Sequence, residues 1–167
     1  MTVTVREAVS DHDWERALAV LHAVYAGEAY ATRERVQEMM TRAKLDGQGT
    51  FLLAVDEADR ILGATLLLAP GSALHQMAEA GEREFRMLAV AAEARGRGAG
   101  EALVRACLER SQEANARGLV LWTQPSMKAA HRLYERLGFV RVPERDQEDP
   151  RGFTRLVYLK RFSDDVR

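Results

Sequence analysis

A run of alternating glycine and arginine residues is the part of the sequence best suited to chemistry. It reads Arg95-Gly96-Arg97-Gly98-Ala99-Gly100 and lies between a strand predicted over Glu84 to Val90 and a helix predicted over residues 98–116. Backbone N–H groups at a helix start lack partners within the helix, and the helix dipole favours negative charge there. Glycines also let a ligand approach the backbone closely. The pattern therefore predicts a phosphate or pyrophosphate site, with Arg95 and Arg97 adding positive charge.

Turns of this kind bind several phosphate-bearing ligands, including dinucleotides and nucleoside triphosphates. Two features of the sequence argue against those two classes. No lysine follows the glycines, as it would in the G-x-x-x-x-G-K-[ST] loop of nucleoside triphosphate sites. A dinucleotide-binding fold places its glycines after the first strand of a parallel sheet, whereas these glycines follow the fourth predicted strand. The residues by themselves therefore leave the identity of the ligand open.

A second motif lies on a late predicted helix and reads Met127-Lys128-Ala129-Ala130-His131-Arg132-Leu133-Tyr134-Glu135-Arg136-Leu137-Gly138-Phe139. With the arginine–glycine run and the Leu-Ala-Val strand end before it, this segment resembles the GCN5-related N-acetyltransferase (GNAT) family. The family patterns are Arg/Gln-x-x-Gly-x-Gly/Ala and, loosely, Asn-x-x-Ala-x-x-Leu-Tyr-x-x-x-Gly-Phe. Met127 departs from the second pattern, because many members carry Asn there. The motifs span residues 84–139, and the element order extends the resemblance over the whole chain.

The resemblance implies acetyl-CoA as cosubstrate, with its pyrophosphate on the Arg95–Gly100 run. It also implies that the pantetheine arm adds beside the strand, through hydrogen bonds to the backbone of Leu88, Ala89 and Val90. The Leu88 N–H is then the candidate donor that polarises the thioester carbonyl and stabilises the oxyanion. The alternative is that these residues only form core strand. A backbone contact is compatible with both interpretations.

Tyr134 is the general acid that the motif implies. When an amine displaces CoA, a thiolate leaves, and a nearby phenol can protonate it. The alternative is an aromatic ring that only packs, because Ala130 and Leu137 share its helix face.

Glu84 is the candidate general base, acting directly or through water. An alkyl ammonium with a pKa of about 10.4 is almost entirely charged at pH 7, whereas an α-amino group near about 7.7–8.0 is roughly a tenth neutral. The need for a base therefore depends on the acceptor. Strand alternation predicts that Glu84 shares a face with Arg86, Leu88 and Val90. Its alternative role is an ion pair with Arg86 or Arg83.

The histidines and the cysteine are not expected to act in the reaction. His131 lies one position away from the helix stripe of Tyr134, and the other histidines, at positions 12, 22 and 75, are scattered. We therefore expect no metal site. Cys107 falls on the apolar face of its helix, which favours an inert core thiol and a direct transfer without an acyl-enzyme.

The acceptor side has weaker signals. Tyr25, Glu28 and Tyr30 cluster between the first two predicted helices, a region that covers the acceptor site in related folds. The alternative is that these residues have no role in binding, with one aromatic side chain, Tyr25, in the core and the others on the surface. The loop from Gly71 to Gly81 is a second candidate border of that site.

The composition fits a single domain over residues 1–167. The chain has 167 residues, 47% of them apolar and 29% charged, with a formal net charge of -1 and one cysteine. The charge balance, without a basic patch and interleaved aromatics, argues against nucleic acid or a membrane surface as partner. Residues 1–9 do not resemble a signal peptide, and the longest apolar stretch, 61–69, is too short for a bilayer span. These features predict a cytoplasmic protein, and the arginine-rich basic residues are typical of a GC-rich bacterial genome.

The predicted element order is β-α-α-β-β-β-α-β-α-β-β. Strands are expected near residues 3–6, 50–55, 61–69, 84–90, 119–123, 139–142 and 153–159, and helices near 10–27, 32–44, 98–116 and 125–138. The strand–helix–strand unit over 84–123 needs a crossover, so its two strands should be parallel neighbours, while the others pair antiparallel. We therefore predict an α/β (α+β) fold with a mixed, largely antiparallel twisted sheet of about seven strands and helices on both faces.

Two functions are compatible with these features. The first is an acetyl-CoA-dependent N-acetyltransferase that acts on a primary amine of a small molecule or peptide. The second is a non-catalytic acyl-CoA-binding sensor or structural protein on the same fold. Tyr134 favours the enzyme, and the missing asparagine at Met127 favours the binder. The sequence does not choose the acceptor, and it leaves the oligomeric state open, a homodimer being compatible with it.

Overall fold

The structure, a computed structural model, describes residues 2–163. In chain order its elements are β1 (Thr4–Glu7), α1 (Asp11–Gly27), α2 (Arg33–Met39), α3 (Arg42–Leu45), β2 (Gly49–Val55), β3 (Ile61–Leu68), β4 (Glu82–Val90), the 3-10 helix η1 (Ala92–Ala94), α4 (Ala99–Glu113), β5 (Gly118–Thr123), α5 (Lys128–Arg136), β6 (Val140–Arg141), the 3-10 helix η2 (Pro143–Arg145), β7 (Gln147–Glu148) and β8 (Thr154–Arg161).

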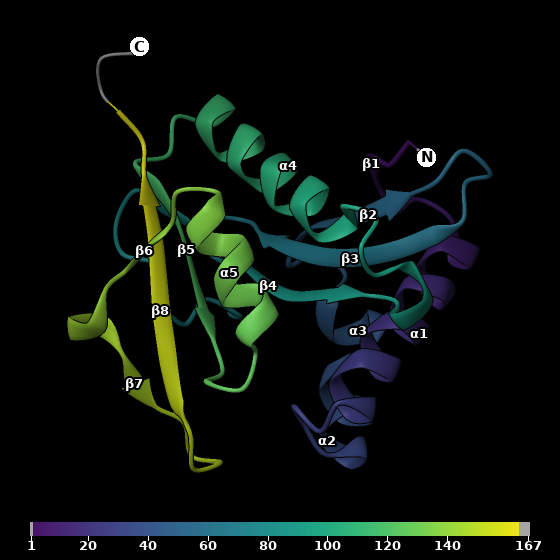
Figure 1. Cartoon of the computed structure of the whole chain (residues 1–167), viewed down its shortest axis with the longest axis horizontal. Helices are drawn as coiled ribbons and strands as arrows, with labels where there is room; N and C mark the ends of the chain where they lie inside the picture. The colour runs from purple at the N-terminus through teal and green to yellow at the C-terminus, as the bar shows by residue number, and fades with distance from the viewer. Residues whose placement is uncertain (1, 164–167) are drawn as a thin grey trace.

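One twisted sheet runs through the molecule in the order β1-β2-β3-β4-β5-β8-β6, and β7 pairs with β8 at its edge (Figure 1). Neighbouring strands are antiparallel except β4 and β5. That pair is joined through α4, the crossover that a parallel connection needs. The predicted fold class and the predicted parallel pair are both confirmed.

The parallel pair separates along its length. β4 and β5 are in register only over Glu82–Glu84 and Gly118–Val120, yet β4 continues to Val90 and β5 to Thr123. The second halves of the two strands therefore diverge and leave backbone without a strand partner on that side (Figure 1). This divergence creates the opening that the functional site occupies.

A β-bulge interrupts β4 just before this opening. Arg86 pairs with Leu66, and Ala89 pairs with Ala64. Between these two pairs, β4 has one more residue than β3. Met87 has a φ of 63°, a left-handed conformation that non-glycine residues seldom adopt. The hydroxyl of Thr65 donates to the carbonyl of Arg86 at 3.0 Å and satisfies a backbone group at the irregularity. The bulge is a local feature that the period-two pattern of the sequence does not reveal.

The bulge changes which way the side chains of β4 face. Before it, Phe85 packs in the core beneath α4; after it, Met87 and Ala89 pack in the core beneath α1. Regular alternation would have placed these three residues on one face. The expectation that Glu84 shares a face with Leu88 and Val90 is therefore wrong, because the extra residue reverses the alternation between them.

Helices cover both faces of the sheet, as predicted. One core lies beneath α1, α2 and α3, and the other beneath α4 and α5. α1 begins at a capping box: Ser10 Oγ accepts from the Asp13 N–H at 3.1 Å, and the Asp13 carboxylate accepts from the Ser10 N–H at 3.3 Å. The box gives two backbone N–H groups at the helix start a side-chain partner.

Two boundaries differ from the prediction. The second helix, expected over residues 32–44, is divided into α2 and α3. Thr41 adopts an extended conformation and its side chain accepts from the Lys44 N–H, so it caps a new helix instead of continuing the old one. The short strand β7 was not expected, and it adds a two-residue ladder to β8.

The loop between β3 and β4 also contributes to the core. Its Met77 packs on Val120, Val157 and Leu159, on the face of β5 and β8 that the helices leave uncovered. Within residues 2–163, no helix is long and apolar enough to cross a membrane.

Candidate active site

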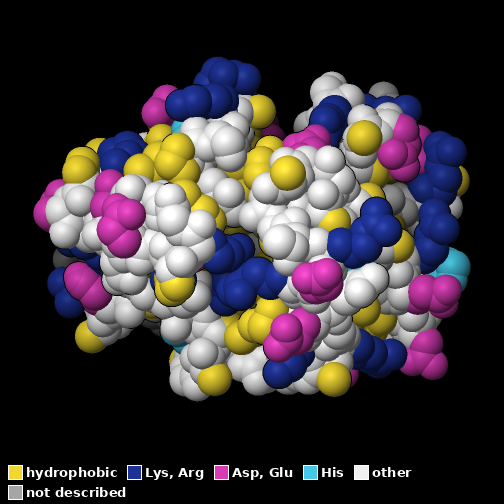
Figure 2. Space-filling model, turned by 90° about the horizontal axis from the view of Figure 1, so that it is seen from below, with side chains coloured by type: hydrophobic (Ala, Val, Ile, Leu, Met, Phe, Trp, Pro, Cys, Tyr) yellow, Lys and Arg dark blue, Asp and Glu magenta, His cyan; other side chains and the backbone are white. Residues whose placement is uncertain are grey.

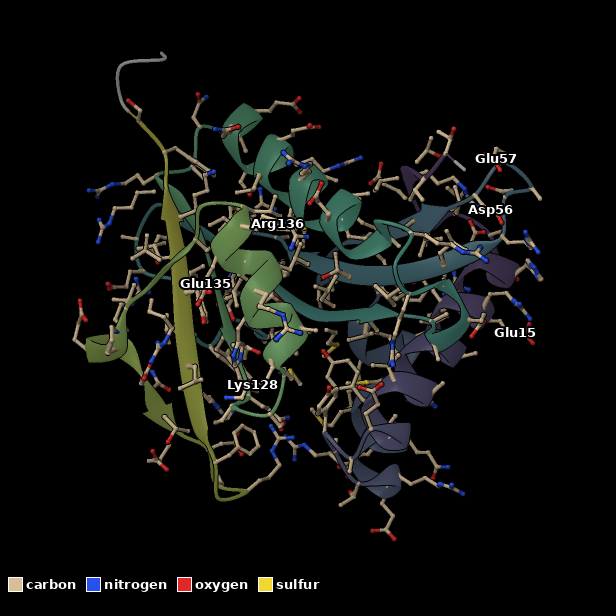
Figure 3. All side chains as sticks on the ribbon, viewed as in Figure 1. Glu15, Asp56, Glu57, Lys128, Glu135 and Arg136 are labelled. Carbon is tan, nitrogen blue, oxygen red and sulfur yellow. The ribbon has the colours of Figure 1, made fainter. Side chains whose placement is uncertain are left out.

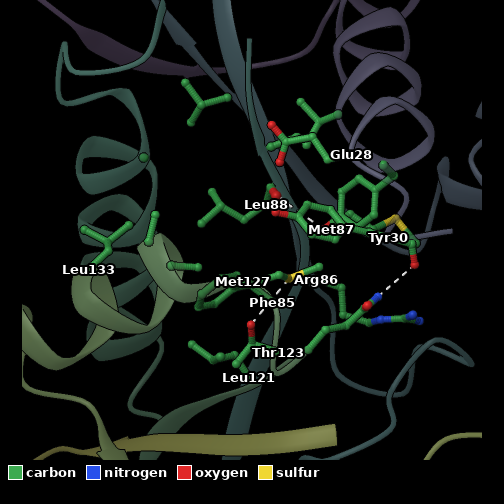
Figure 4. A pocket seen from close by; sticks show the side chains of 18 of the residues that line it. Glu28, Tyr30, Phe85, Arg86, Met87, Leu88, Leu121, Thr123, Met127 and Leu133 are labelled. Carbon is green, nitrogen blue, oxygen red and sulfur yellow. Dashed lines mark hydrogen bonds between the residues drawn. The ribbon is translucent and has the colours of Figure 1, made fainter. Parts of the chain in front are cut away.

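A cavity of about 620 Å³ lies where β4 and β5 separate (Figure 4). Its wall combines the end of α1, the start of α2, the second half of β4, the start of α4, the end of β5 and one face of α5. The molecule is hollowed at the middle of the face seen in Figure 2, where Lys and Arg side chains gather. The cavity therefore draws together segments from most of the chain, including both sequence motifs.

The glycine–arginine turn forms one end of the cavity. Gly96 and Gly98 have φ values of 81° and 84°, so each uses the backbone freedom that glycine alone has at low cost. Gly98 is the N-cap of α4, and the first bond of this helix joins the Ala102 N–H to the Gly98 carbonyl. The N–H groups of Ala99 and Gly100 therefore have no partner within the helix. Because both residues line the cavity, these amides suit an anionic ligand.

The two arginines of the turn are placed differently. Arg95 lines the cavity, and its guanidinium is hydrogen-bonded and ion-paired to the carboxylate of Glu28 at the end of α1. Arg97 is exposed and is not part of the cavity wall. At the same end, Arg136 of α5 pairs with Glu101 of α4 at 3.3 Å (Figure 3). The charge at this end therefore comes from Arg95 and from residues of α5 that the sequence did not single out.

Leu88, Ala89 and Val90 line the cavity along β4. The pairing of β4 with β3 passes over Met87 and Leu88, so the bulge releases main-chain groups at this point from the ladder. The Leu88 carbonyl accepts a hydrogen bond from the Tyr25 hydroxyl at 3.3 Å. An arm with its own amide groups could therefore pair with this segment as an added strand would.

Tyr134 borders the cavity from α5 and is only 5% exposed. Its ring packs against Phe85, Phe139 and Tyr158, with centroids 6.1, 5.8 and 5.8 Å away. Its hydroxyl has no hydrogen-bond partner among residues 2–163, and burial raises the pKa of the phenol well above its usual range. The ring of Tyr134 thus packs in the core while its protonated hydroxyl lies at the cavity, and the general-acid role stays a prediction.

Glu84 has a different role from the one expected. It is fully buried, it does not line the cavity, and it forms no ion pair within 4.0 Å in the described part of the chain. Its carboxylate instead accepts from three backbone N–H groups of the β3–β4 loop, at 3.1 Å from Gln76, 2.9 Å from Met77 and 3.0 Å from Ala78. A carboxylate held this way fixes the loop, and it lies outside the cavity wall, so the geometry does not support the base role.

Several cavity residues were not found from the sequence. Trp122 lines it from β5, Gln124 from just after β5, Arg151 from the loop between β7 and β8, Arg86 from β4 and Arg35 from α2. The side-chain amide of Gln124 donates to the Tyr30 carbonyl at 2.9 Å, which connects the β5 end to the α1–α2 segment. No motif marks these positions. The one available signal was Arg86, an arginine inside an apolar strand.

The expected acceptor border is present in part. Tyr25, Glu28 and Tyr30 all line the cavity, whereas no residue of the loop from Gly71 to Gly81 does. The loop instead supports two residues that line the cavity. Its Leu74 carbonyl accepts from Arg86 at 3.2 Å, and its Gln76 side chain accepts from Trp122 at 2.7 Å.

Cys107 and His131 lie away from the cavity wall. Cys107 is fully buried beneath α4, and burial raises the pKa of its thiol to about 12. His131 is bonded through Nε2 to the Gln124 carbonyl at 2.9 Å. Within the described residues, no three His, Cys, Asp or Glu side chains gather in a way that could hold a metal ion.

Comparison with known proteins agrees with this architecture. The sequence model of the acetyltransferase (GNAT) family matches residues 11–139. The mycothiol acetyltransferase of Renibacterium salmoninarum is 31% identical over 145 residues, which cover 83% of this chain and 41% of that protein. The PaiA N-acetyltransferase of Thermoplasma acidophilum, solved in complex with coenzyme A, superposes with a TM-score of 0.75 at 15% identity, over 97% of this chain and 100% of that one.

A GNAT family acetyltransferase from Brucella melitensis, solved with acetyl-CoA, superposes with a TM-score of 0.64 at 19% identity, over 97% of this chain and 89% of that one. Because the family model matches residues 11–139, most of the sequence, the chain belongs to the acetyltransferase (GNAT) family. It spans about two fifths of the length of the curated relatives it matches, 41% and 43% for two mycothiol acetyltransferases.

Proposed function

We propose that this chain is an acetyl-CoA-dependent N-acetyltransferase that transfers the acetyl group directly to a primary amine of a small molecule or peptide. The observation that carries the proposal is a single cavity that joins the anion-binding start of α4, the diverging strands β4 and β5, and the hydroxyl of Tyr134. Family membership supports the transferase class, and the relatives solved with coenzyme A or acetyl-CoA support the cosubstrate.

The residues present fit coenzyme A. Amides at the start of α4 suit a pyrophosphate, and the absence of a side chain at Gly98 leaves open space, since a Cβ there would meet nothing within 4 Å. Apolar groups of Val90 and Leu133 border the path from this turn toward β4. The unpaired backbone of β4 suits an amide-bearing arm.

Bound acetyl-CoA would supply an acetyl thioester, and the chain would supply the groups around it. The Leu88 N–H is the candidate donor to the thioester oxygen, because the bulge frees this segment from β3. The Tyr134 hydroxyl is the candidate donor to the departing sulfur. No acyl-enzyme is invoked, because the thiol of Cys107 is buried and away from the cavity.

Removal of the amine proton is assigned to solvent. The Glu84 carboxylate is held by three backbone amides, and Glu28, which does line the cavity, is paired to Arg95. The hydrogen bond to Tyr30, followed by the bond to Arg95, lowers the pKa of Glu28, so it is a weak base. An acceptor that is partly neutral near pH 7, such as an α-amine, suits a site of this kind.

The second candidate is a non-catalytic acyl-CoA-binding protein. One observation favours it: Met127 replaces the family's asparagine, and its sulfur accepts from the Thr123 hydroxyl at 3.4 Å. Two measurements separate the candidates. Calorimetry should detect CoA binding in both cases, and thiol release from acetyl-CoA across a panel of amines should occur only for an enzyme. Binding without turnover would select the second candidate, and a folded protein that fails to bind CoA would overturn both.

A further inference from the structure

The end of the cavity away from the glycine–arginine turn, called the acceptor end below, is lined by Arg35, Arg86 and Arg151. The start of α4 lies against Val90, since a Cβ on Gly100 would be 3.6 Å from its Cγ2. Four residues earlier on β4, the Arg86 guanidinium carbon lies 6.0 Å from the ring centre of Trp122. Arg86 therefore occupies the part of the wall away from the phosphate turn, toward the Tyr30 side of the cavity in Figure 4.

Arg86 is a largely buried cation with few partners. One guanidinium nitrogen donates to the Leu74 carbonyl at 3.2 Å, and no carboxylate lies within 4.0 Å of it among residues 2–163. Burial lowers its pKa, while the negative charge of Glu84 opposes that shift. The carboxylate of Glu84 is itself held by loop amides. A guanidinium has five N–H donors, so Arg86 has donors left for a ligand anion. No carboxylate among the described residues of the cavity wall pairs with its charge.

Two further arginines add to this charge. Arg35, exposed on α2, forms no ion pair within the described part of the chain. Arg151 is paired with Asp149, but the same carboxylate also binds Arg155, so one negative charge serves two guanidinium groups. Among the described residues, the two acids that line the cavity, Glu28 and Glu101, are already paired with Arg95 and Arg136. The wall therefore carries an excess of positive charge.

We propose that the acceptor is a primary amine that also carries a carboxylate, and that Arg86 and Arg35 bind this carboxylate. The inference rests on the proposed acetyl transfer and names its substrate class. Arginine binds carboxylates through paired, charge-assisted hydrogen bonds, and these strengthen away from bulk water. A polyamine would instead bring positive charge to a positive wall and be repelled.

The first test compares substrates that differ only in the anion. Each of several α-amino acids is assayed beside its carboxamide and its decarboxylated amine, with phosphoethanolamine as the phosphate alternative and spermidine as the cationic one. We expect kcat/KM for the carboxylates to exceed that of the carboxamides by about 10–100-fold, the scale of a charge-assisted hydrogen bond. Equal or better turnover of carboxamides or spermidine overturns the inference, as does a preference for the phosphate.

The second test uses arginine variants with a matched control. Arg86→Gln and Arg35→Gln should raise KM for a carboxylate substrate, by about 10–100-fold at Arg86. They should change KM for the decarboxylated amine far less, because it lacks a group for these arginines to bind, and both variants should keep CoA binding. Arg33→Gln is the control, because Arg33 lies two residues from Arg35 on α2 but outside the cavity wall. Calorimetric binding of the carboxylate substrate to the CoA-bound protein gives a readout that does not depend on turnover.

The outcomes separate the two proposals. If amines are acetylated without any preference for a carboxylate, this inference fails and the proposed function stands. If no amine of any class is acetylated, both fail. If Arg86→Gln does not fold, the inference is tested with the exposed Arg35→Gln variant and the substrate series. An unchanged KM for the carboxylate substrate in Arg35→Gln, together with equal use of carboxamides by the wild type, then overturns the inference.

Discussion

The Tyr25 hydroxyl of α1 donates to the Leu88 carbonyl of β4 at 3.3 Å, just after the bulge at Met87. Burial raises the pKa of Tyr25 well above its usual range, so this phenol remains a donor at any pH of interest. The bond connects a helix on one face of the sheet to the strand segment that we assign to the thioester. It therefore holds the Leu88 peptide in the orientation that the bulge sets.

Removing this bond should affect both stability and rate. Tyr25→Phe should lower the free energy of unfolding by about 0.5–1.5 kcal/mol, the net value of one hydrogen bond, and should also slow turnover. Tyr158→Phe is the matched control, because its hydroxyl bonds to Glu135 at the same 3.3 Å outside the cavity wall. Urea unfolding and initial rates check both variants. An equal loss of turnover in the two variants would remove the positioning role of Tyr25.

The glycine turn can be tested with two substitutions of equal backbone cost. Gly98 and Gly71 have φ values of 84° and 83°, and a Cβ on either would meet no atom within 4 Å. Alanine at each should therefore destabilise the ligand-free protein by a similar amount, about 1–2 kcal/mol. Only Gly98→Ala should reduce the rise in melting temperature that CoA produces, because Gly71 lies outside the cavity wall. A full CoA shift in Gly98→Ala would show that the phosphate lies elsewhere.

Tyr134→Phe should keep the packed ring and remove the proton donor. We expect turnover to fall by about 10²–10⁴-fold while CoA binding is retained. Because burial raises the pKa of Tyr134 above the ordinary value of about 10, the acid form persists throughout the assay range. The loss should therefore be uniform with pH below about 10, without movement of the basic limb. If Tyr134→Phe turns over at the wild-type rate across that pH range, Tyr134 only packs and is not the general acid.

Glu84→Gln should behave as a loop variant rather than a base variant. All three backbone N–H groups bond to one carboxylate oxygen, Oε1, so the amide keeps an acceptor but loses the negative charge and the second contact of the Gln76 N–H to Oε2, and stability should fall by about 1–3 kcal/mol. KM for the acceptor should rise, since the loop supports Arg86 and Trp122, while the acidic limb of the pH–rate profile stays in place. If Glu84→Gln instead slows turnover by about two orders of magnitude and removes the acidic limb of the pH–rate profile, Glu84 is the general base after all.

Asp56→Asn provides the control for Glu84. The Asp56 carboxylate likewise accepts from backbone N–H groups, those of Ala58 and Arg60, in the β2–β3 hairpin (Figure 3). Asp56 lies outside the cavity wall, so its loss should lower stability without changing KM for either substrate.

Local patterns predicted much of the fold. The first helix, predicted near residues 10–27, is α1, which begins after the capping box of Ser10 and Asp13 and ends at Gly27. The crossover over residues 84–123 was sufficient to predict the parallel pair. The division of the second helix at Thr41 was missed, because a threonine in an amphipathic run can continue a helix or cap a new one.

The sequence pointed to candidate site residues only where the chemistry is local to the chain, and their roles stay predictions. The glycine turn and Tyr134 lie in short motifs, and both line the cavity. The role of Glu84 was not predictable, because its partners come from a loop that folds back onto it. Met87 gave no signal either, since only the paired strands impose its positive φ. Arg86 became a candidate only once the cavity placed it beside Trp122.

The most direct test of the account is the fate of isotopically labelled acetyl groups. The protein is incubated with labelled acetyl-CoA and a mixture of carboxylate-bearing, neutral and cationic amines, and both small molecules and protein are analysed by mass spectrometry. We expect label on the nitrogen of an acceptor amine, with free CoA formed in equal amount and no label on Cys107. A folded protein that binds CoA yet yields no labelled amine, or that carries the label on its own thiol, would contradict direct acetyl transfer in this cavity.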